Sequence, residues 1–408
     1  MSKQMSAQTR RWWTDPKQLR KRFAKGARDR DTVIYASLLI AALILPELTY
    51  FMTESTFWIS LMADAGVWVL LAIGLNVVVG FAGLLDLGYA AFFAIGAYTY
   101  ALLASSQLGA TPIQHEVHLP FWLLLFVGMF MAAAFGAILG FPTLRLRGDY
   151  LAIVTLGFGE IVPDVFRNAE KWTGGINAIG NIDQPTLWYW INGPWADLPL
   201  GIVKNFRFAY DPVPYYVMIV ILVVTSVILV HNLQRSRLGR AWMAIREDEV
   251  AAAAMGINTV TTKLLAFAIG ASFSGFAGVF LGAKLSLVGP DNFLFIVSIT
   301  VLVMVVLGGM GNIQGVIVGS LVVYAINFYI LTNLPNWAIG AAKTFGLDFL
   351  IERNGDWSGI GDETQRLNFL LFGLILVLMM LLRPQGLLPS RVREQELKHA
   401  TDVILEIK

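Results

Sequence analysis

Residues 57–79 read FWISLMADAGVWVLLAIGLNVVV, an apolar run in which Asp64 is the one charged side chain. A helix needs about 20 mostly apolar residues to cross the hydrocarbon core of a bilayer, so this run is long enough to span a membrane. Comparable runs lie at 33–52, 88–106, 121–141, 149–166, 213–231, 264–282, 293–308, 313–331 and 367–382. We therefore expect an all-α polytopic integral membrane protein with about ten transmembrane helices.

The composition agrees with a membrane location. The 408 residues are 56% hydrophobic and 14% charged, whereas soluble domains carry roughly 25% charged residues. The net charge of +2 predicts no nucleic-acid partner. The absence of cysteine excludes disulfides, a thiolate nucleophile and a Cys-based metal site. Of the four histidines, only His115 and His118 are close enough to share a ligand, and because they lie in a polar loop we expect neither a metal nor a cofactor.

The basic residues indicate the orientation of the chain. Short cytoplasmic loops of membrane proteins collect Lys and Arg. With ten spans and both termini inside, every basic cluster falls on the cytoplasmic side. These clusters are Arg145 with Arg147; Arg235, Arg237, Arg240 and Arg246; and Arg383, Arg391 and Arg393. The predicted organisation is a basic cytoplasmic tail at 1–31, a transmembrane domain at 32–383 with a cytoplasmic loop at 232–263, and a cytoplasmic tail at 384–408.

The basic tail and the outer segments each have two interpretations. Residues 1–31 contain ten Lys or Arg, which either fix the orientation or, with Trp12 and Trp13, bind membrane lipid as a surface helix. The outer segment 168–212 contains Trp172, Trp188, Trp190 and Trp195, which form either an aromatic belt or a docking surface. The outer segments 107–120, 283–292 and 332–366 are expected to be loops.

Glycine spacing predicts close helix packing. Pairs four residues apart occur at Gly136 and Gly140, at Gly278 and Gly282, and along Gly311, Gly315 and Gly319. Such spacing lets membrane helices approach closely. The cluster of Gly308, Gly309 and Gly311 predicts a break between the eighth and ninth spans.

The loop between the predicted spans at 213–231 and 264–282 reads HNLQRSRLGRAWMAIREDEVAAAAMGINTVTTK from His231 to Lys263. Its residues from Gly239 to Ala254 are good helix formers, and Gly256 supplies a helix stop. We expect one short cytoplasmic helix here. The physical pattern alone fits equally a helix that docks into a soluble partner and an ordinary solvated loop.

This loop resembles the coupling loop of ABC importer permeases, and in particular that of the branched-chain amino acid (LivM-type) permeases. The resemblance extends through GLNVVVGFAGLLDLGYAAFFAIGAY (74–98), FPTLRLRGDYLAIVTLGFGEI (141–161), TGGINAI (173–179) and VVLGGMGNIQG (305–315). It covers roughly residues 60–330. It implies an ATPase contact made by Arg246, Glu247, Asp248, Glu249, Ala251, Ala252 and Gly256. The general permease pattern would place the acid one residue later, at Val250.

The resemblance also implies the partners and the location. They are a homologous second permease, two ATP-binding subunits and a periplasmic substrate-binding protein, all at a bacterial inner membrane. The sequence lacks the G-x-x-x-x-G-K-[ST] run that cradles phosphates, so ATP hydrolysis belongs to partner subunits and the chain is not an enzyme. The implied substrates are leucine, isoleucine and valine.

Polar residues inside the spans are candidates for the translocation path, because an ionisable group in hydrocarbon is costly. Glu160 lies between Gly157, Gly159 and Pro163, where an interrupted helix could offer backbone groups to a substrate; it could equally lie near the outer interface. Asp86 is either on the path or a helix N-cap just before Leu87, and the cap is favoured. Asn76 is expected to bond across helices.

Three other functions fit the sequence less well. An importer permease for urea or short amides shares the loop and the glycines and differs only in substrate. A self-sufficient secondary transporter needs an ion relay, for which Asp64, Asp86 and Glu160 are few. A receptor or scaffold without transport is the third.

Overall fold

The computed structural model describes residues 35, 37–42, 44, 55–143, 149–185, 212–347, 359–382 and 386–388. Several predicted features lie outside the described residues. They are the tail at 1–31, most of the first predicted span, Arg145 and Arg147, Arg383, Arg391 and Arg393, and Trp188, Trp190 and Trp195. The chain divides into two compact units after Trp58. In the first unit, residues 35, 37–42 and 44 are helical.

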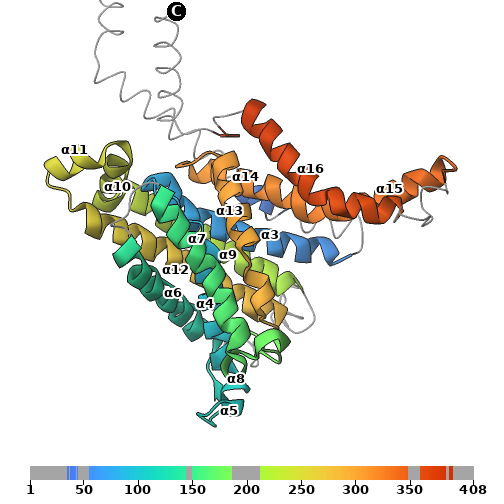
Figure 1. Ribbon diagram of the computed structural model, residues 1–408, viewed down its shortest axis with the longest axis horizontal. Helices are drawn as coiled ribbons and strands as arrows, with labels where there is room; N and C mark the ends of the chain where they lie inside the picture. Colours follow the sequence, from blue (N-terminus) through green and yellow to red (C-terminus); the bar gives the residue numbers. More distant parts are fainter. Residues whose placement is uncertain are drawn as a thin grey trace, which may run out of the picture. The chain divides into compact units, whose positions relative to one another are not determined.

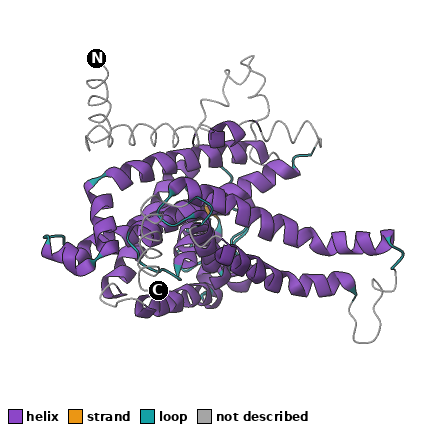
Figure 2. Ribbon diagram, turned by 90° about the horizontal axis from the view of Figure 1, so that it is seen from above, coloured by secondary structure: helices purple, strands orange, loops and turns teal. Residues whose placement is uncertain are grey.

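The second unit is built almost entirely of helices (Figures 1 and 2). The long helices are α3 (Phe57–Leu75), α4 (Tyr89–Leu103), α6 (Phe121–Thr143), α7 (Asp149–Asn168), α9 (Pro212–Arg235), α12 (Thr259–Leu285), α13 (Phe295–Gly308), α14 (Ile313–Tyr324), α15 (Thr332–Thr344) and α16 (Ile360–Leu382). Two π-helical segments continue α3 and α14, namely η1 (Asn76–Phe81) and η5 (Ala325–Leu331). The short elements are β1 (Ala104–Ser105), α5 (Gln107–Ala110), β2 (Val117–His118), α8 (Glu170–Thr173), η2 (Gly175–Asn177), α10 (Arg237–Glu247), α11 (Glu249–Ala254) and η4 (Pro290–Phe293).

Among the described residues, six helical stretches are long and apolar enough to cross a membrane. They are Phe57–Phe81, Phe121–Thr143, Pro212–Arg235, Thr259–Leu285, Pro290–Gly308 and Ile313–Thr344, and the shorter α4 is also apolar. Each contains a run that the sequence predicted. The all-α membrane class is therefore confirmed, and the total of ten spans stays a prediction.

Helix α12 forms the centre of the bundle and packs against α4 and α6. Glycine makes these contacts possible. A Cβ added at Gly278 would lie 2.3 Å from the Phe93 carbonyl oxygen, and one at Gly136 would lie 2.6 Å from the Ala271 Cβ. Helices α13 and α14 meet in the same way, since a Cβ at Gly315 would lie 2.3 Å from the Gly308 carbonyl oxygen. The predicted packing role of these glycines is confirmed.

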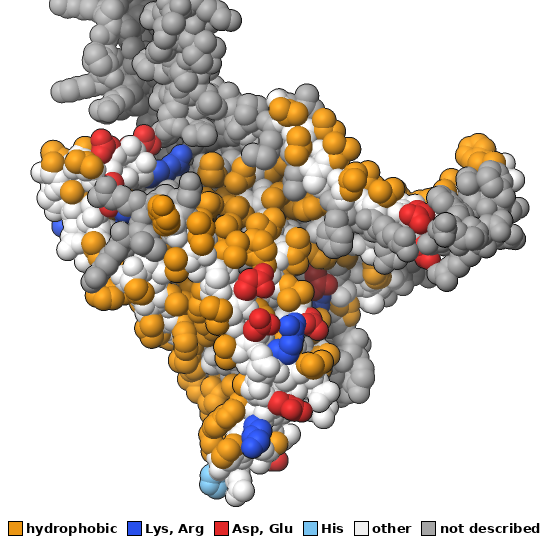
Figure 3. All heavy atoms as spheres, viewed as in Figure 1, with side chains coloured by type: hydrophobic (Ala, Val, Ile, Leu, Met, Phe, Trp, Pro, Cys, Tyr) orange, Lys and Arg blue, Asp and Glu red, His pale blue; other side chains and the backbone are white. Residues whose placement is uncertain are grey.

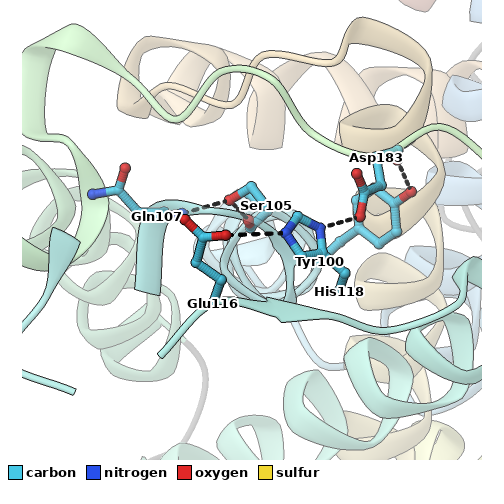
Figure 4. Close-up of polar contacts among 7 residues, drawn as sticks. Tyr100, Ser105, Gln107, Glu116, His118 and Asp183 are labelled. Carbon is cyan, nitrogen blue, oxygen red and sulfur yellow. Dashed lines mark hydrogen bonds and ion pairs between the residues drawn. The ribbon is translucent and has the colours of Figure 1, made fainter. Parts of the chain in front are cut away.

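A strap at 178–183 crosses one end of the bundle, beside the hairpin of β1 and β2. Its backbone pairs with Val288 through Ile179, and the Asp183 amide donates to the Ala104 carbonyl over 2.7 Å. The Asp183 carboxylate holds the hairpin, because its Oδ2 lies 2.5 Å from His118 Nδ1. In Figure 4, Glu116 and Asp183 stand on either side of the His118 ring. His118 thus serves to bind the strap to the hairpin.

Two helix boundaries differ from those considered from the sequence. The interrupted helix that was one alternative at Glu160 does not occur, because α7 is continuous through Pro163; a proline is tolerated in a membrane helix when its surroundings satisfy the freed backbone group. The segment 332–366, expected to be a loop, contains α15 and the start of α16, which pack against each other. Its polar residues lower the hydropathy without preventing a helix.

Candidate functional site: the coupling loop and the helix α7 face

The loop between α9 and α12 folds as two helices, α10 and α11, where one was expected (Figure 1). Asp248 separates them because its backbone is extended, with φ −154° and ψ 109°. Its Oδ1 accepts hydrogen bonds from the amides of Val250 and Ala251 over 2.8 and 3.0 Å. Asp248 is therefore the N-cap of α11, a role for which a short acceptor side chain is preferred. The expected stop after α11 is confirmed at Gly256, which has φ +86°.

Helix α10 is anchored by the indole of Trp242. This side chain is fully buried, and its Nε1 donates to the Thr262 carbonyl oxygen at the start of α12 over 2.7 Å. The corner between α9 and α10 needs glycine, since a Cβ at Gly239 would lie 2.4 Å from the Leu233 carbonyl oxygen. The position of α10 is thus fixed by packing as well as by the chain connection.

Helix α11 is held by an ion pair between Glu249 and Lys263. The Lys263 Nζ lies 2.6 Å from Glu249 Oε1, and the lysine side chain is only 7% exposed. Breaking a buried pair of this kind by removing one partner costs about 3–5 kcal/mol, because it leaves an uncompensated charge. Glu249 therefore faces its own chain, and Ala252 is buried beside it on the same side of α11.

Arg246 connects α10 to the membrane helices. Its guanidinium donates from Nη1 to the Gly80 carbonyl oxygen over 2.6 Å. Gly80 lies in the last turn of η1, where carbonyl groups have no partner within the helix. The same Nη1 would lie 3.2 Å from a Cβ at Gly311. Arg246 therefore reaches η1 and the turn between α13 and α14 at once.

Asn76 joins these two elements directly. Its Oδ1 accepts from the Gly311 amide over 2.9 Å, which confirms the expected bond across helices. The turn at 309–312 also receives the chain beyond α16. The Leu387 amide donates to the Leu307 carbonyl over 2.8 Å, and Asn312 Nδ2 donates to the Leu388 carbonyl over 2.9 Å. We call the assembly of Arg246, η1, the 309–312 turn and residues 386–388 the inner junction.

The remaining candidate residues of the loop face outward. Glu247, Asp248, Ala251 and Gly256 are exposed. Two large apolar side chains accompany them, Val250 at 69% and Met255 at 84% exposure. The seven candidates thus divide into an inward set that holds the loop in place and an outward surface of α11.

Among the candidates for the translocation path, Glu160, Gly157 and Gly159 lie on α7. Glu160 is exposed, and a Cβ at Gly157 would meet nothing within 4 Å. Gly159 faces the bundle, where a Cβ would lie 3.0 Å from the Gly88 Cα. Acidic and basic side chains gather on the face of the molecule that contains α7 and α13 (Figure 3). Helix α7 thus carries Glu160 and, one turn further on, Asp164 among its exposed side chains.

Asp86 is fully buried, in the segment between η1 and α4. Its Oδ1 accepts from the Gly88 amide over 2.9 Å, and its Oδ2 has no hydrogen-bond partner among the described residues. The expected cap just before Leu87 is wrong in position, since α4 begins at Tyr89 and Gly88 occupies the N-cap. Asp86 instead orders the turn that leads into the helix.

Sequence reasoning missed the inward contacts of the loop. Trp242, Ile245, Glu249 and Ala252 recur every three or four residues, a helical spacing that could have identified one buried face. Lys263 and the residues of the 309–312 turn gave no such signal, because their partners are distant in the sequence.

These features define an integral membrane protein with a structured loop tied to its membrane helices. A family model described as the permease component of the branched-chain amino acid transport system matches residues 57–381. The chain belongs to this family. No solved structure matches it.

Three relatives illustrate the range of similarity. The chain is 38% identical to the high-affinity branched-chain amino acid transport system permease protein LivM of Escherichia coli, over 93% of this chain and 80% of the relative. It is 28% identical to the permease protein BraD of Pseudomonas aeruginosa, over 79% of this chain and 91% of the relative. It is 27% identical to the permease protein LivH of E. coli, over 62% of this chain and 79% of the relative.

Proposed function

We propose that this chain forms one half of the translocation path of an ATP-driven importer for leucine, isoleucine and valine. The observation that carries the proposal is the inner junction. A loop that served only to connect α9 with α12 through solvent would not need a guanidinium bound to η1. Arg246 gives the loop a mechanical connection to α3 through Gly80 and to α13 and α14 through the 309–312 turn. Membership of the permease family supports the same assignment.

The partners follow from this proposal. Two ATP-binding subunits hydrolyse the ATP, and one of them binds the outward surface of α11 around Val250, Ala251 and Met255. A homologous second permease completes the path, as the similarity to both LivM and LivH proteins suggests. A periplasmic substrate-binding protein delivers the amino acid to the importer.

The proposed location is the inner membrane of a bacterium, with both termini in the cytoplasm. In this arrangement residues 32–383 form the permease domain, and 1–31 and 384–408 are cytoplasmic. Helix α7 lines the path, because the exposed Glu160 is more stable beside water or a partner than in lipid. Gly157 leaves open space one turn before it, and Gly159 lets α7 pack closely against Gly88.

In the proposed mechanism, movement of the ATP-binding subunits displaces α10 and α11 together. The Glu249–Lys263 pair keeps α11 attached to α12 during this movement. Arg246 transmits the displacement to η1, and the helices rock so that the path opens on one side of the membrane at a time.

The experiment that tests the function is uptake of labelled leucine into vesicles that contain the full importer, with and without this chain. We expect ATP-dependent uptake only when the chain is present. Equal uptake without it would mean that the chain serves another substrate or task. Competition by unlabelled leucine against urea separates the amino-acid importer from the urea alternative.

A further inference from the structure

A second buried ion pair lies in the apolar bundle, far along α12 from the coupling loop. The Lys284 Nζ lies 2.5 Å from Asp64 Oδ1 of α3 and donates to the Ser60 carbonyl oxygen over 3.0 Å. The lysine side chain is 9% exposed and that of Asp64 is 36% exposed. Ionisable groups in membrane helices are rare and mark pathways by default, whereas apolar residues can replace a purely structural pair with little loss of stability.

An aromatic cluster begins on the face of α3 that carries Asp64. Trp68 lies four residues after Asp64 on α3, so the two share one helix face. Trp68 packs on Phe328 with ring centroids 4.9 Å apart, and Phe328 stacks on Tyr324 at the same distance. Asp64 also interacts electrostatically with the Tyr324 phenol.

The backbone is irregular at the same place. The π-helix η5 begins directly after Tyr324. Single π-helical turns within helices occur frequently at functional sites, because they re-aim the side chains of one turn. Here the π-helix supplies Phe328 to the aromatic cluster. An acid, a base and an apolar aromatic surface therefore come together from three parts of the bundle, α12, α3 and the α14–η5 helix.

This combination matches one chemical class of ligand. We propose that Asp64, Lys284, Trp68 and Phe328 form a binding subsite for a free zwitterionic amino acid with an apolar side chain. The α-ammonium of the ligand pairs with Asp64, its α-carboxylate pairs with Lys284, and its side chain packs on the two rings. The inference rests on the proposed function, and it adds a place where the substrate stops inside this subunit.

Insertion of a zwitterion keeps every charge paired. The Asp64–Lys284 contact opens, and each residue exchanges its protein partner for one charge of the ligand. No uncompensated charge is left in the low-dielectric bundle, where it would cost several kcal/mol. A 2-oxo acid, which lacks the ammonium, would leave Asp64 unpaired. The greater exposure of Asp64 makes it the first group that the ligand meets.

Photo-leucine, a leucine analogue with a diazirine in its side chain, tests the subsite in the wild-type importer. The full complex is illuminated during ATP-driven turnover, and labelled peptides are identified by mass spectrometry. We expect labelling within 57–75 or 324–331 that excess leucine prevents and the corresponding 2-oxo acid does not. Leucine uptake without protectable labelling of these segments would overturn the subsite alone. Absence of leucine uptake by the wild-type importer would overturn the proposed function itself.

The double variant Asp64→Asn with Lys284→Met removes both charges and keeps side chains of similar size. We expect uptake to fall by about tenfold or more, as for the loss of charged hydrogen bonds to a ligand. ATP hydrolysis stimulated by the loaded binding protein should stay within about twofold of the wild-type rate, because both substitutions lie at the end of α12 that is far from the loop between α9 and α12. Unchanged uptake, or equal loss of uptake and stimulated hydrolysis, would show that the pair is only a structural clamp.

A matched control removes another charged pair at the strap. His118→Gln with Asp183→Asn abolishes the contact between these side chains and leaves the backbone bonds of Asp183 and Ile179 in place. Exposed ion pairs contribute little to the stability of a protein. Uptake by this control should therefore equal that of the wild type within about twofold.

Discussion

Helix α12 carries a buried lysine near each end, and the two lysines form similar ion pairs in different surroundings. Lys263 pairs with Glu249 of a short helix outside the long membrane helices, whereas Lys284 pairs with Asp64 inside an apolar helix. In both pairs the lysine is almost fully buried and the carboxylate is about one-third exposed, at 32% and 36%. The same chemistry thus holds the loop between α9 and α12 at one end of α12 and lies near an aromatic cluster at the other.

The role of a buried ion pair depends on the side chains that surround it. Around Lys263 the neighbouring contacts are structural, namely the Trp242 indole on Thr262 and the Asp248 cap of α11. At the other pair, Asp64 shares its helix face with Trp68, which packs on the rings of Phe328 and Tyr324 at the start of a π-helix. We therefore expect the pair at Lys263 to tolerate exchange of its charges and the pair at Lys284 to require its present arrangement.

The largest effect is expected from Glu249→Lys. The new ammonium would face Lys263, whose side chain is buried, and the loss of a buried pair costs about 3–5 kcal/mol before repulsion is added. Leucine uptake should be abolished while the chain still inserts into the membrane, as measured in vesicles and by immunoblot of the membrane fraction.

Exchange of both charges is the control for that prediction. Glu249→Lys combined with Lys263→Glu restores an ion pair at the same place, so much of the uptake should return. No recovery would show that Glu249 contacts the ATP-binding subunit directly and that its pair with Lys263 is secondary.

The next effect concerns the inner junction. Arg246→Ala removes the bond to the Gly80 carbonyl, and hydrogen bonds to charged groups contribute about 1.5–3 kcal/mol. We expect ATP hydrolysis by the complex to continue while leucine uptake falls, so the ratio of ATP hydrolysed to leucine transported rises. Arg240→Ala, on the same helix, is the matched control because among the described residues Arg240 donates a side-chain hydrogen bond only to the nearby Arg235 carbonyl. A constant ratio for Arg246→Ala would contradict the transmission role.

A smaller effect is expected at Glu160, which contrasts with both lysines because it has no ion-pair partner among the described residues. Glu160→Gln removes a charge from the exposed side of α7 without changing its size. Uptake should fall several-fold, with normal insertion, if α7 lines a hydrated path. The variant Glu160→Leu distinguishes a side chain that faces lipid from one that faces a hydrated path. If residue 160 faces lipid, the apolar side chain should increase the amount of folded protein and leave uptake unchanged.

The smallest effect is expected from Trp242→Phe. The indole bond to the Thr262 carbonyl is lost and most of the buried ring is kept, a change of about 1 kcal/mol. The melting temperature of the purified complex should decrease slightly, with an unchanged ratio of ATP hydrolysed to leucine transported. A changed ratio would place Trp242 in the transmission of movement together with Arg246.

Much of the fold could be predicted from local patterns. The apolar runs correspond to helices such as α6 and α12, and Gly308, Gly309 and Gly311 correctly predicted the break between α13 and α14. Helix formation depends on neighbouring residues and on apolar length, both of which are visible in one sequence. The continuation of α14 through η5 into α15 is not visible in the hydropathy, because polar residues after Leu331 lower the hydropathy although the helix continues.

The candidate site was predicted as a segment and could not be predicted as a set of contacts. From the sequence alone follow the helical membrane class, a charged and helix-forming loop at 232–263, and the motifs of a permease family. The contacts of Arg246 with Gly80, of Glu249 with Lys263 and of Lys284 with Asp64 follow from the tertiary packing. The two residues of each contact are 14 to 220 positions apart, and no periodicity connects them. Such partners are chosen by how the helices pack, because a buried charge is stable only where packing brings its counter-charge or a free carbonyl within reach.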